Sequence, residues 1–403
     1  MPHATTGGST DAALRRARRL LDRAPLIDGH NDLAWTIRND PTAPGDVEAY
    51  DLRKRTPGDT DLARLREGRV AGQFWSVYVP GDAKAEGFAR LQAEQIDIAR
   101  RVIARYPERL ALCLTAADVA RAVRRRRLAS LLGMEGGHAI ENSLGALRAF
   151  YELGVRYMTL THNVTHDWAD AAVDTPRHGG LTRFGEEVVR EMNRLGMLVD
   201  LAHVSPDVMA QALDVSEAPV IFSHSCCRAL TDVPRNVPDA ILARLRDNGG
   251  VVMITFVGPF VSQEVAAAHA AGMVEVRKLT AGVTDRRERR RIERRYFTDH
   301  PLPRATVAQV ADHVEHARRV AGVGHIGIGG DYDGNEEWPV GLEDVSGYPR
   351  LFAELVRRGW SDADLARLAG GNLLRALRRA EAVARRLRRT RPPSTATIDG
   401  SAG

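Results

Sequence analysis

Short apolar runs alternate along the chain with longer segments in which apolar residues recur every three or four positions. The runs have the length of strands buried on both faces, and the longer segments have the period of amphipathic helices. The better strand candidates are residues 26–27, 73–79, 128–134, 156–160, 197–201, 219–222, 251–256 and 325–330, with a weaker run at 110–114. Alternating strands and helices in this number predict an α/β fold, a (β/α)8 TIM-like barrel, with an open doubly wound sheet as the alternative.

The pattern divides the chain into one large domain and two tails. Residues 1–10 and 391–403 are rich in small and polar residues, and both are predicted to be disordered. Residues 11–390 are predicted to form a single domain, which is long for one domain but within the range of barrels with insertions. Within it, residues 258–304 are predicted to be an irregular insert.

Histidines and carboxylates recur at one kind of place, the C-terminal end of predicted strands. The set is His30, Asp32, Glu135, His162, His203, His224 and Asp331. In a barrel these ends share one face, and that face carries the active site. Any one of these histidines alone would more often be structural than a ligand, but their shared placement argues for a site. Imidazoles and carboxylates are ligands that Zn²⁺ accepts, and a carboxylate such as Glu135 could bridge two ions.

Composition changes this picture little. The net charge is +5, and nearly all the basic residues are arginines that alternate with acids along helices. The arginine run at 286–295 is predicted to be a solvated helix in which Glu288 and Glu293 neighbour arginines. A nucleic-acid or anionic-lipid patch is the alternative, disfavoured because no aromatic residues are interleaved for base stacking. We therefore expect neither a nucleic-acid nor a membrane partner.

The chain has three cysteines, and neither an apolar N-terminal segment nor a membrane-length apolar run. That pattern provides no disulfide framework and is typical of a reducing compartment. The expectation is therefore a cytoplasmic protein.

A series of motifs in a fixed order extends this reading. They are residues 26–35 (Leu-Ile-Asp-Gly-His-Asn-Asp-Leu-Ala-Trp), 133–140, 157–170, 198–205, 219–225, 235–238, 327–334 (Gly-Ile-Gly-Gly-Asp-Tyr-Asp-Gly) and 341–345. In these motifs the chain resembles the membrane (renal) dipeptidase family of dizinc peptidases, within the amidohydrolase superfamily, from about residue 26 to residue 378. Residues 258–304 diverge from the family pattern.

The resemblance implies two Zn²⁺ ions per chain and assigns protein ligands to each ion. His30 and Asp32 would bind one zinc, His203 and His224 the other, and Glu135 would bridge them. A hydroxide between the metals would then attack the peptide carbonyl.

The resemblance also implies three residues that act on the substrate. Asp331 would move the proton between the attacking water and the leaving amine, with Asp333 as a rival in the same motif. His162 would stabilise the oxyanion. Arg235 would hold the terminal carboxylate of the substrate, with an ordinary surface arginine as the less favoured alternative.

The expected function is zinc-dependent hydrolysis of the peptide bond of dipeptides, including those with a D-residue at the C-terminal position. The alternatives are a related amidohydrolase that acts on N-acyl amino acids or β-lactams, and a catalytically silent metal-binding homologue. The expected partner is a small-molecule dipeptide. The sequence does not determine the oligomeric state, and a homodimer is compatible with it.

Overall fold

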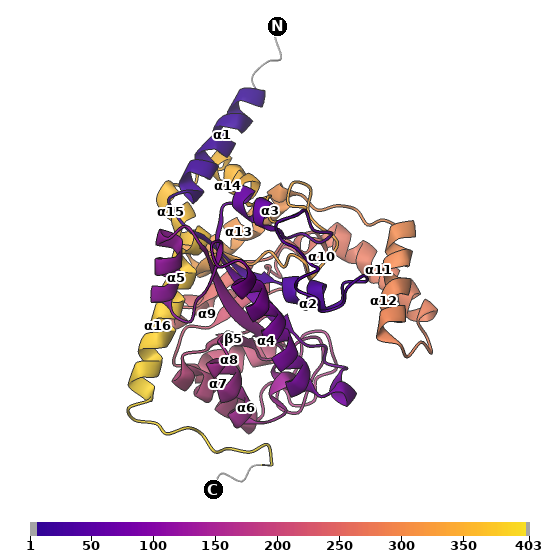
Figure 1. Ribbon diagram of the computed structural model, residues 1–403, viewed down its shortest axis with the longest axis vertical. Coiled ribbons are helices and arrows are strands. Elements are labelled where there is room, and N and C mark those ends of the chain that lie inside the picture. The colour runs from indigo at the N-terminus through magenta and orange to yellow at the C-terminus, as the bar shows by residue number, and fades with distance from the viewer. Residues whose placement is uncertain (1–5, 400–403) are drawn as a thin grey trace.

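A computed structural model describes residues 6–399 as a barrel of parallel strands surrounded by helices (Figure 1). The strand order is β2-β1-β9-β8-β7-β6-β5-β4, and pairing of β2 with β4 closes the ring. The strands are β1 (Leu26–Asn31), β2 (Val70–Tyr78), β4 (Leu128–Glu135), β5 (Val155–Thr159), β6 (Leu198–Asp200), β7 (Ile221–Ser225), β8 (Val251–Ile254) and β9 (Ile326–Ile328). Closure confirms the (β/α)8 prediction. The weaker run forms β3 (Leu110–Leu112), which pairs with the start of β4 outside the ring.

The register of the strands brings their C-terminal ends to one mouth. Tyr78 at the end of β2 is paired with Glu135 at the end of β4, and Glu135 is paired with Thr159 at the end of β5. Every residue of β4 is buried. The strands read as apolar runs because helices cover their outer face and side chains fill the interior.

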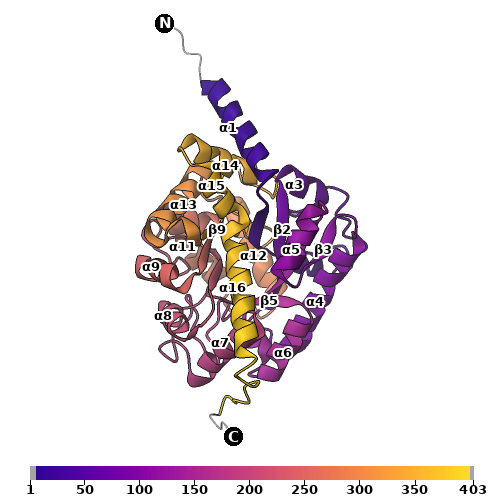
Figure 2. The same cartoon turned by 90° about the vertical axis from the view of Figure 1, so that its left-hand side faces the viewer.

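The helices that follow the strands form the outer layer. They are α2 (Leu33–Arg38), α3 (Leu62–Glu67), α4 (Phe88–Arg105), α5 (Ala116–Arg124), α6 (Leu144–Glu152), α7 (Arg183–Leu195), α8 (Pro206–Val215), α9 (Asp239–Asn248), α13 (Val307–Ala321), α14 (Tyr348–Arg357), α15 (Asp362–Ala366) and α16 (Asn372–Leu387). Several begin at a side-chain cap, as where the Thr182 hydroxyl accepts the N–H of Gly185. In Figure 2, α16 runs along the flank of the barrel.

The N-terminal helix α1 (Thr6–Leu21) begins earlier than predicted. Residues 6–10 are helical rather than disordered, and residues 1–5 lie outside the described part of the chain. The buried side chains of Ala13 and Ala17 belong to the part of α1 that packs against α14. Adding turns to a helix that is already nucleated costs little, which explains the early start.

The predicted disorder of the C-terminal tail is wrong for residues 391–399. This segment has no helix or strand, but it lies against α7. The Ser394 N–H donates to Glu191 at 3.3 Å, and its hydroxyl donates to Glu187 at 3.0 Å. Ala396 and Ile398 pack against the hydrophobic core. These contacts depend on distant residues, so composition could not reveal them; residues 400–403 lie outside the described chain.

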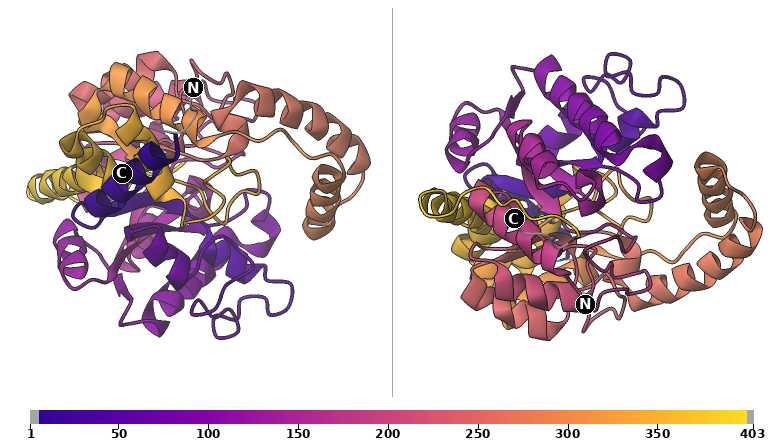
Figure 3. Two further views of the ribbon diagram at one scale, coloured as in Figure 1. Left: turned by 90° about the horizontal axis from the view of Figure 1, so that it is seen from above. Right: turned by 90° about the horizontal axis from the view of Figure 1, so that it is seen from below.

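The insert at 258–304 is mostly helical, which corrects the expectation of an irregular segment. It contains α10 (Gly258–Val261), α11 (Gln263–Leu279) and α12 (Arg286–Asp299), and α11 and α12 form an arm at the side of the barrel (Figure 3). The Ser262 hydroxyl caps α11, which continues through an alanine-rich turn. Helix α12 has no buried residue, which confirms the predicted solvated helix. Among residues 6–399, no helix is long and apolar enough to cross a membrane.

Candidate metal centre and active site

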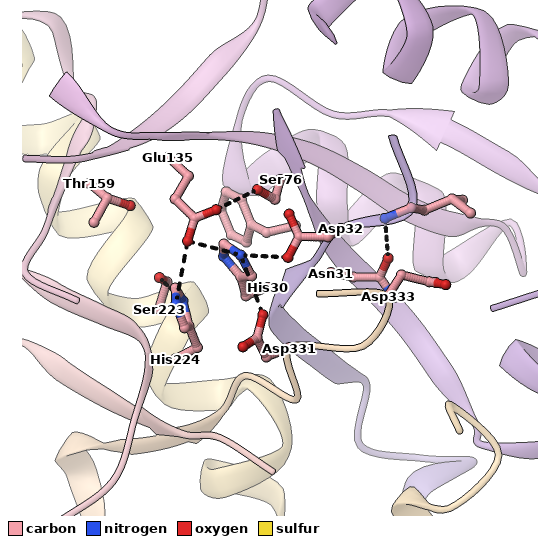
Figure 4. A network of polar contacts seen from close by, with 12 residues as sticks. His30, Asn31, Asp32, Ser76, Glu135, Thr159, Ser223, His224, Asp331 and Asp333 are labelled. Atoms are coloured by element: carbon pink, nitrogen blue, oxygen red, sulfur yellow. Dashed lines mark hydrogen bonds and ion pairs between the residues drawn. The ribbon is translucent and has the colours of Figure 1, made fainter. Parts of the chain in front are cut away.

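Five of the predicted residues gather at the mouth of the barrel, and Figure 4 shows four of them around the Glu135 carboxylate. The Oε1 atom of Glu135 lies 3.0 Å from His203 Nε2, 3.4 Å from His224 Nε2 and 3.5 Å from His30 Nε2. Asp32 Oδ2 lies 3.2 Å from His30 Nε2. They come from the ends of β1, β4 and β7 and from the loop after β6, as their positions in the sequence predicted.

Hydrogen bonds behind two of the imidazoles determine which ring nitrogen carries the proton. The Tyr157 hydroxyl donates to the Gly29 carbonyl at 3.2 Å and lies 2.8 Å from His30 Nδ1, so it accepts the Nδ1 proton. His203 Nδ1 lies 2.8 Å from the Asn163 side-chain oxygen, which can only accept. Both rings therefore present the lone pair of Nε2 to Glu135.

His224 is held by a carboxylate that acts through a hydroxyl. The Ser223 hydroxyl donates to Asp200 Oδ2 at 2.6 Å and lies 2.8 Å from His224 Nδ1, so it accepts that proton. Asp200 also accepts from Thr159 Oγ1 at 2.6 Å and from the Ser223 backbone N–H at 2.8 Å. Such hydrogen bonds orient metal-ligating histidines and make them more basic.

The polar atoms of the cluster do not satisfy one another, but divalent metal ions would satisfy them. With both Nδ1 atoms protonated, the Nε2 lone pairs of His203 and His224 face each other at 2.9 Å. His30 Nε2 and Asp32 Oδ1 are buried without a hydrogen-bond partner. Orphaned buried polar atoms are costly unless a cation joins them. Two groups of three can each hold an ion and share Glu135: His30, Asp32 and Glu135, and Glu135, His203 and His224.

The protonation states of two of the histidines agree with this arrangement. Burial above all lowers the pKa of His203 and of His224 well below the ordinary value. Both imidazoles are therefore neutral at physiological pH, which is the form that binds a metal.

Asp331 lies beside the cluster, and its rival Asp333 does not join it. Asp331 Oδ1 is 3.7 Å from His30 Nε2, close enough for Asp331 to form a third ligand group with His30 and His224. Its backbone has φ +69°, in the left-handed region that residues other than glycine adopt uncommonly. Burial, together with Asp32 and Glu135, raises its pKa well above the ordinary value. A carboxylate with a raised pKa is a stronger base, which suits proton transfer.

Asp333 is engaged with a carboxylate outside the metal cluster. Its Oδ1 accepts the Asp59 backbone N–H at 2.9 Å, and its own N–H donates to Asp59 Oδ2 at 2.9 Å. This reciprocal pairing turns the Asp333 side chain toward Asp59. The geometry therefore favours Asp331 as the residue that transfers the proton.

Arg235 is a buried cation with little to neutralise it, contrary to the surface-arginine alternative. It is 4% exposed, its Nη2 donates to the His224 carbonyl at a long 3.5 Å, and its Nη1 has no partner. Its guanidinium lies 5.1 Å from the Phe260 ring centroid. Burial lowers its pKa to about 10, so it remains charged at neutral pH. A desolvated guanidinium with free N–H groups is a site for a carboxylate.

His162 is half-buried at the edge of the cluster. Its ring centroid lies 4.3 Å from that of His203 and 4.6 Å from that of Tyr78. Burial above all lowers its pKa well below the ordinary value. A neutral imidazole there can donate one hydrogen bond to an oxyanion.

The residues that hold the ligands were not predicted. They are Ser76, whose hydroxyl donates to Glu135 Oε2 at 3.3 Å, and the residues Tyr157, Asn163, Asp200 and Ser223 described above. The available signal was a buried charge inside an apolar run, as at Asp200 in Leu-Val-Asp-Leu. Such a charge needs partners, but the sequence does not say which.

Comparisons with known proteins agree with the geometry. The chain matches the membrane dipeptidase family (peptidase family M19) over residues 14–391. It is 43% identical to Dipeptidase 3 of Mus musculus over 380 residues, 93% of this chain and 68% of the relative. It is 41% identical to Dipeptidase verJ of Clonostachys rogersoniana over 392 residues, 94% of this chain and 90% of the relative.

A solved structure extends the comparison to three dimensions. A metallo peptidase from Rhodobacter sphaeroides, liganded with a phosphinate mimic of the dipeptide L-Ala-D-Ala, is 26% identical and has a TM-score of 0.71. The match covers 88% of this chain and 99% of that one. The shared barrel, the metal-ligand cluster at its mouth and the match over almost the whole sequence lead to one conclusion: the chain belongs to the membrane dipeptidase family, peptidase family M19.

Proposed function

We propose that this protein hydrolyses the peptide bond of dipeptides with two zinc ions per chain. His30 and Asp32 would hold one ion, His203 and His224 the other, and Glu135 both. The observation that carries the proposal is the pair of ligand groups that share Glu135, with the unpaired guanidinium of Arg235 beside them. Nitrogen and oxygen ligands suit zinc, although other divalent ions compete for such a set.

When bound, zinc would polarise the substrate carbonyl and lower the pKa of water from 15.7 to about 7, and so supply the electrophile and the nucleophile of such a reaction. The hydrogen bonds from the His30, His203 and His224 Nδ1 atoms keep all three Nε2 lone pairs directed at the centre.

Arg235 supports a substrate with a free carboxylate close to the scissile bond. Its free N–H groups lie next to His224, so a carboxylate bound there is only a few atoms from the reacting carbonyl. That geometry suits the C-terminal carboxylate of a dipeptide. The two curated relatives are named dipeptidases, and the R. sphaeroides enzyme holds a dipeptide mimic.

Asp331 and His162 would handle the proton and the developing charge. The raised pKa of Asp331 suits a group that receives a proton from the attacking water and returns it to the leaving amine. The neutral ring of His162 would donate to the tetrahedral oxyanion. Both are in place at the cluster, which argues against a catalytically silent homologue.

N-acyl amino acids and β-lactams are the rival substrates, because both can offer a carboxylate to Arg235. The test is turnover of L,L- and L,D-dipeptides beside N-acetyl amino acids and a β-lactam. Each is measured before chelation, after chelation and after zinc is restored, with Asp331→Asn as the matched variant. We expect zinc-restored dipeptide cleavage that is lost in Asp331→Asn. A protein with two bound metals that cleaves only a rival substrate would overturn the proposal.

A further inference from the structure

The Arg-rich helix α12 is tied to the mouth of the barrel on both sides of Arg290. Arg286 pairs with Asp82 at 2.8 Å and with Glu86 at 3.4 Å, in the segment that follows β2. Arg294 pairs with Glu336, in the segment that follows β9. Residues 286, 290 and 294 are four apart and share one face of the helix. The two ties therefore turn the face that carries Arg290 toward the barrel.

A continuous row of rings connects Arg290 to the metal centre. Its guanidinium lies 5.5 Å from the Trp35 ring centroid, and Trp35 lies 4.9 Å from Tyr78. Tyr78 is followed by His162 at 4.6 Å, and His162 by the ligand His203 at 4.3 Å. The row forms one wall that runs from the reacting end of the site to α12.

Arg290 is an exposed cation whose hydrogen-bonding edge is available. It forms no ion pair among the described residues, although Glu293 on the next turn feels its charge. A guanidinium that lies over an indole keeps its N–H groups free to donate in the ring plane. An open groove of about 660 Å³ begins here, and its lining includes Trp35, Arg38, Pro44, Glu86, Arg287 and Arg290.

Two of the other cations beside this groove are paired with acids. Arg38 pairs with Glu94 at 2.7 Å, and Arg286 pairs with Glu86 at 3.4 Å.

We propose that Arg290 is a specificity-determining residue that selects dipeptides with a carboxylate side chain, aspartyl or glutamyl. The inference rests on the proposed dipeptidase function and deepens it. Arg235 takes the main-chain carboxylate, which leaves Arg290, at the far end of the ring wall, for a side chain. One cation at the end of the ring wall matches a small anion better than the many phosphates of a nucleic acid.

The test compares glutamyl dipeptides with their glutaminyl isosteres, at each of the two positions, in wild type and variants. A charge-assisted hydrogen bond typically contributes about 1.5–3 kcal/mol, which corresponds to roughly 10–100-fold in kcat/KM. We expect Arg290→Gln to lower kcat/KM for the preferred glutamyl dipeptide by about that factor. The glutaminyl isostere and Ala-Ala should change by no more than about twofold. Arg290→Glu should shift the preference toward lysyl dipeptides.

Arg289→Gln is the matched control. Arg289 is on the same helix but donates to the Thr284 carbonyl at 3.2 Å and does not line the groove. It should leave every ratio unchanged.

The outcomes separate this inference from the proposed function. Cleavage of neutral dipeptides with a glutamyl-to-glutaminyl ratio that Arg290→Gln leaves unchanged would overturn the role of Arg290 and leave the dipeptidase standing. An equal loss for all dipeptides would overturn selectivity and assign Arg290 a structural role. No cleavage of any dipeptide by the wild type would overturn both.

Discussion

The metal-ligand cluster and helix α12 are both dense in charged residues, but they differ in what surrounds the charge. In the cluster, Glu135 and three imidazoles are buried, and His30 Nε2 has no partner within the protein. In α12 every side chain is at least partly exposed, and Glu288 pairs with Arg291 at 2.7 Å. The buried atoms of the first region need a bound cation to satisfy them, whereas water solvates the charges of the second.

The energetic consequence follows from desolvation. Removing one ion from water costs several kcal/mol, whereas an exposed ion pair contributes about 0–1 kcal/mol. A buried cluster of ionisable groups that lack hydrogen-bond partners therefore marks function more reliably than a high local density of charge. The following experiments test this contrast, from the largest expected effect to the smallest.

Glu135→Gln should abolish metal binding at the shared position and reduce dipeptide hydrolysis to background. The substitution preserves shape but removes the charge that faces three Nε2 atoms. Metal content after dialysis and a dipeptidase assay measure the effect, with Glu288→Gln on α12 as the control that should change neither. Full metal content in Glu135→Gln would contradict the proposed difference between the buried cluster and helix α12.

Arg235→Met should lower kcat/KM by roughly 10²–10³-fold, within the 2–5 kcal/mol typical of a lost buried charge pair. The same variant should be more stable than wild type by about 1–4 kcal/mol, because an apolar side chain replaces a buried and poorly paired ion. Urea unfolding beside steady-state kinetics tests both signs. A loss of stability would show that contact with Phe260 outweighs the desolvation cost.

Ser223→Ala should weaken metal binding by about 10–100-fold, as expected for a lost hydrogen bond behind a ligand. The variant disconnects His224 from Asp200. Ser225→Ala is a matched control on the same strand, because the Ser225 hydroxyl is buried without a partner. Competition with a chelator measures the affinity. Equal losses in both variants would point to packing instead of the relay.

Asp59→Asn tests a half-buried carboxyl that lies outside the metal cluster. Burial, and then Asp333, raises the pKa of Asp59 from 3.8 to about 8. The folded state thus favours the protonated form, and wild type loses stability as the pH rises from the ordinary pKa through about 8. The variant lacks this titration and should gain stability relative to wild type between pH 5 and pH 8, measured by chemical unfolding.

Asp51→Asn is the control of opposite sign. A hydrogen bond from Arg53 lowers the pKa of Asp51 to about 2, so its contribution is lost only in acid. Its difference from wild type should stay constant between pH 5 and pH 8. A difference for Asp59→Asn that is also constant over this range would contradict the assignment.

Arg294→Gln should have the smallest effect, a change in stability below about 0.5 kcal/mol, because its ion pair with Glu336 is exposed. Urea unfolding at low and high salt measures it. A loss above about 1 kcal/mol would mean that α12 is anchored through this pair and would weaken the contrast between the two regions.

Local pattern was sufficient for the barrel and for the side chains that gather at its mouth. Strand and helix periods are carried by neighbouring residues, and His30, Glu135 and His224 are recognisable because each ends an apolar run. The same logic failed for the insert and for the C-terminal tail. In the tail, the order of Ser394 comes from Glu187 and Glu191, about 200 positions earlier in the chain.

The sequence by itself thus determined the fold class, the face that carries the site and the chemical type of its ligands, because repeat and spacing are local properties. The tertiary structure decided which polar atoms are left without partners. Asp200 reaches His224 through Ser223, Arg235 remains buried and poorly paired, and Arg290 lies over Trp35 from an insert more than 250 residues away. Desolvation and strand register act between distant segments, so these relations exist only once the barrel has closed.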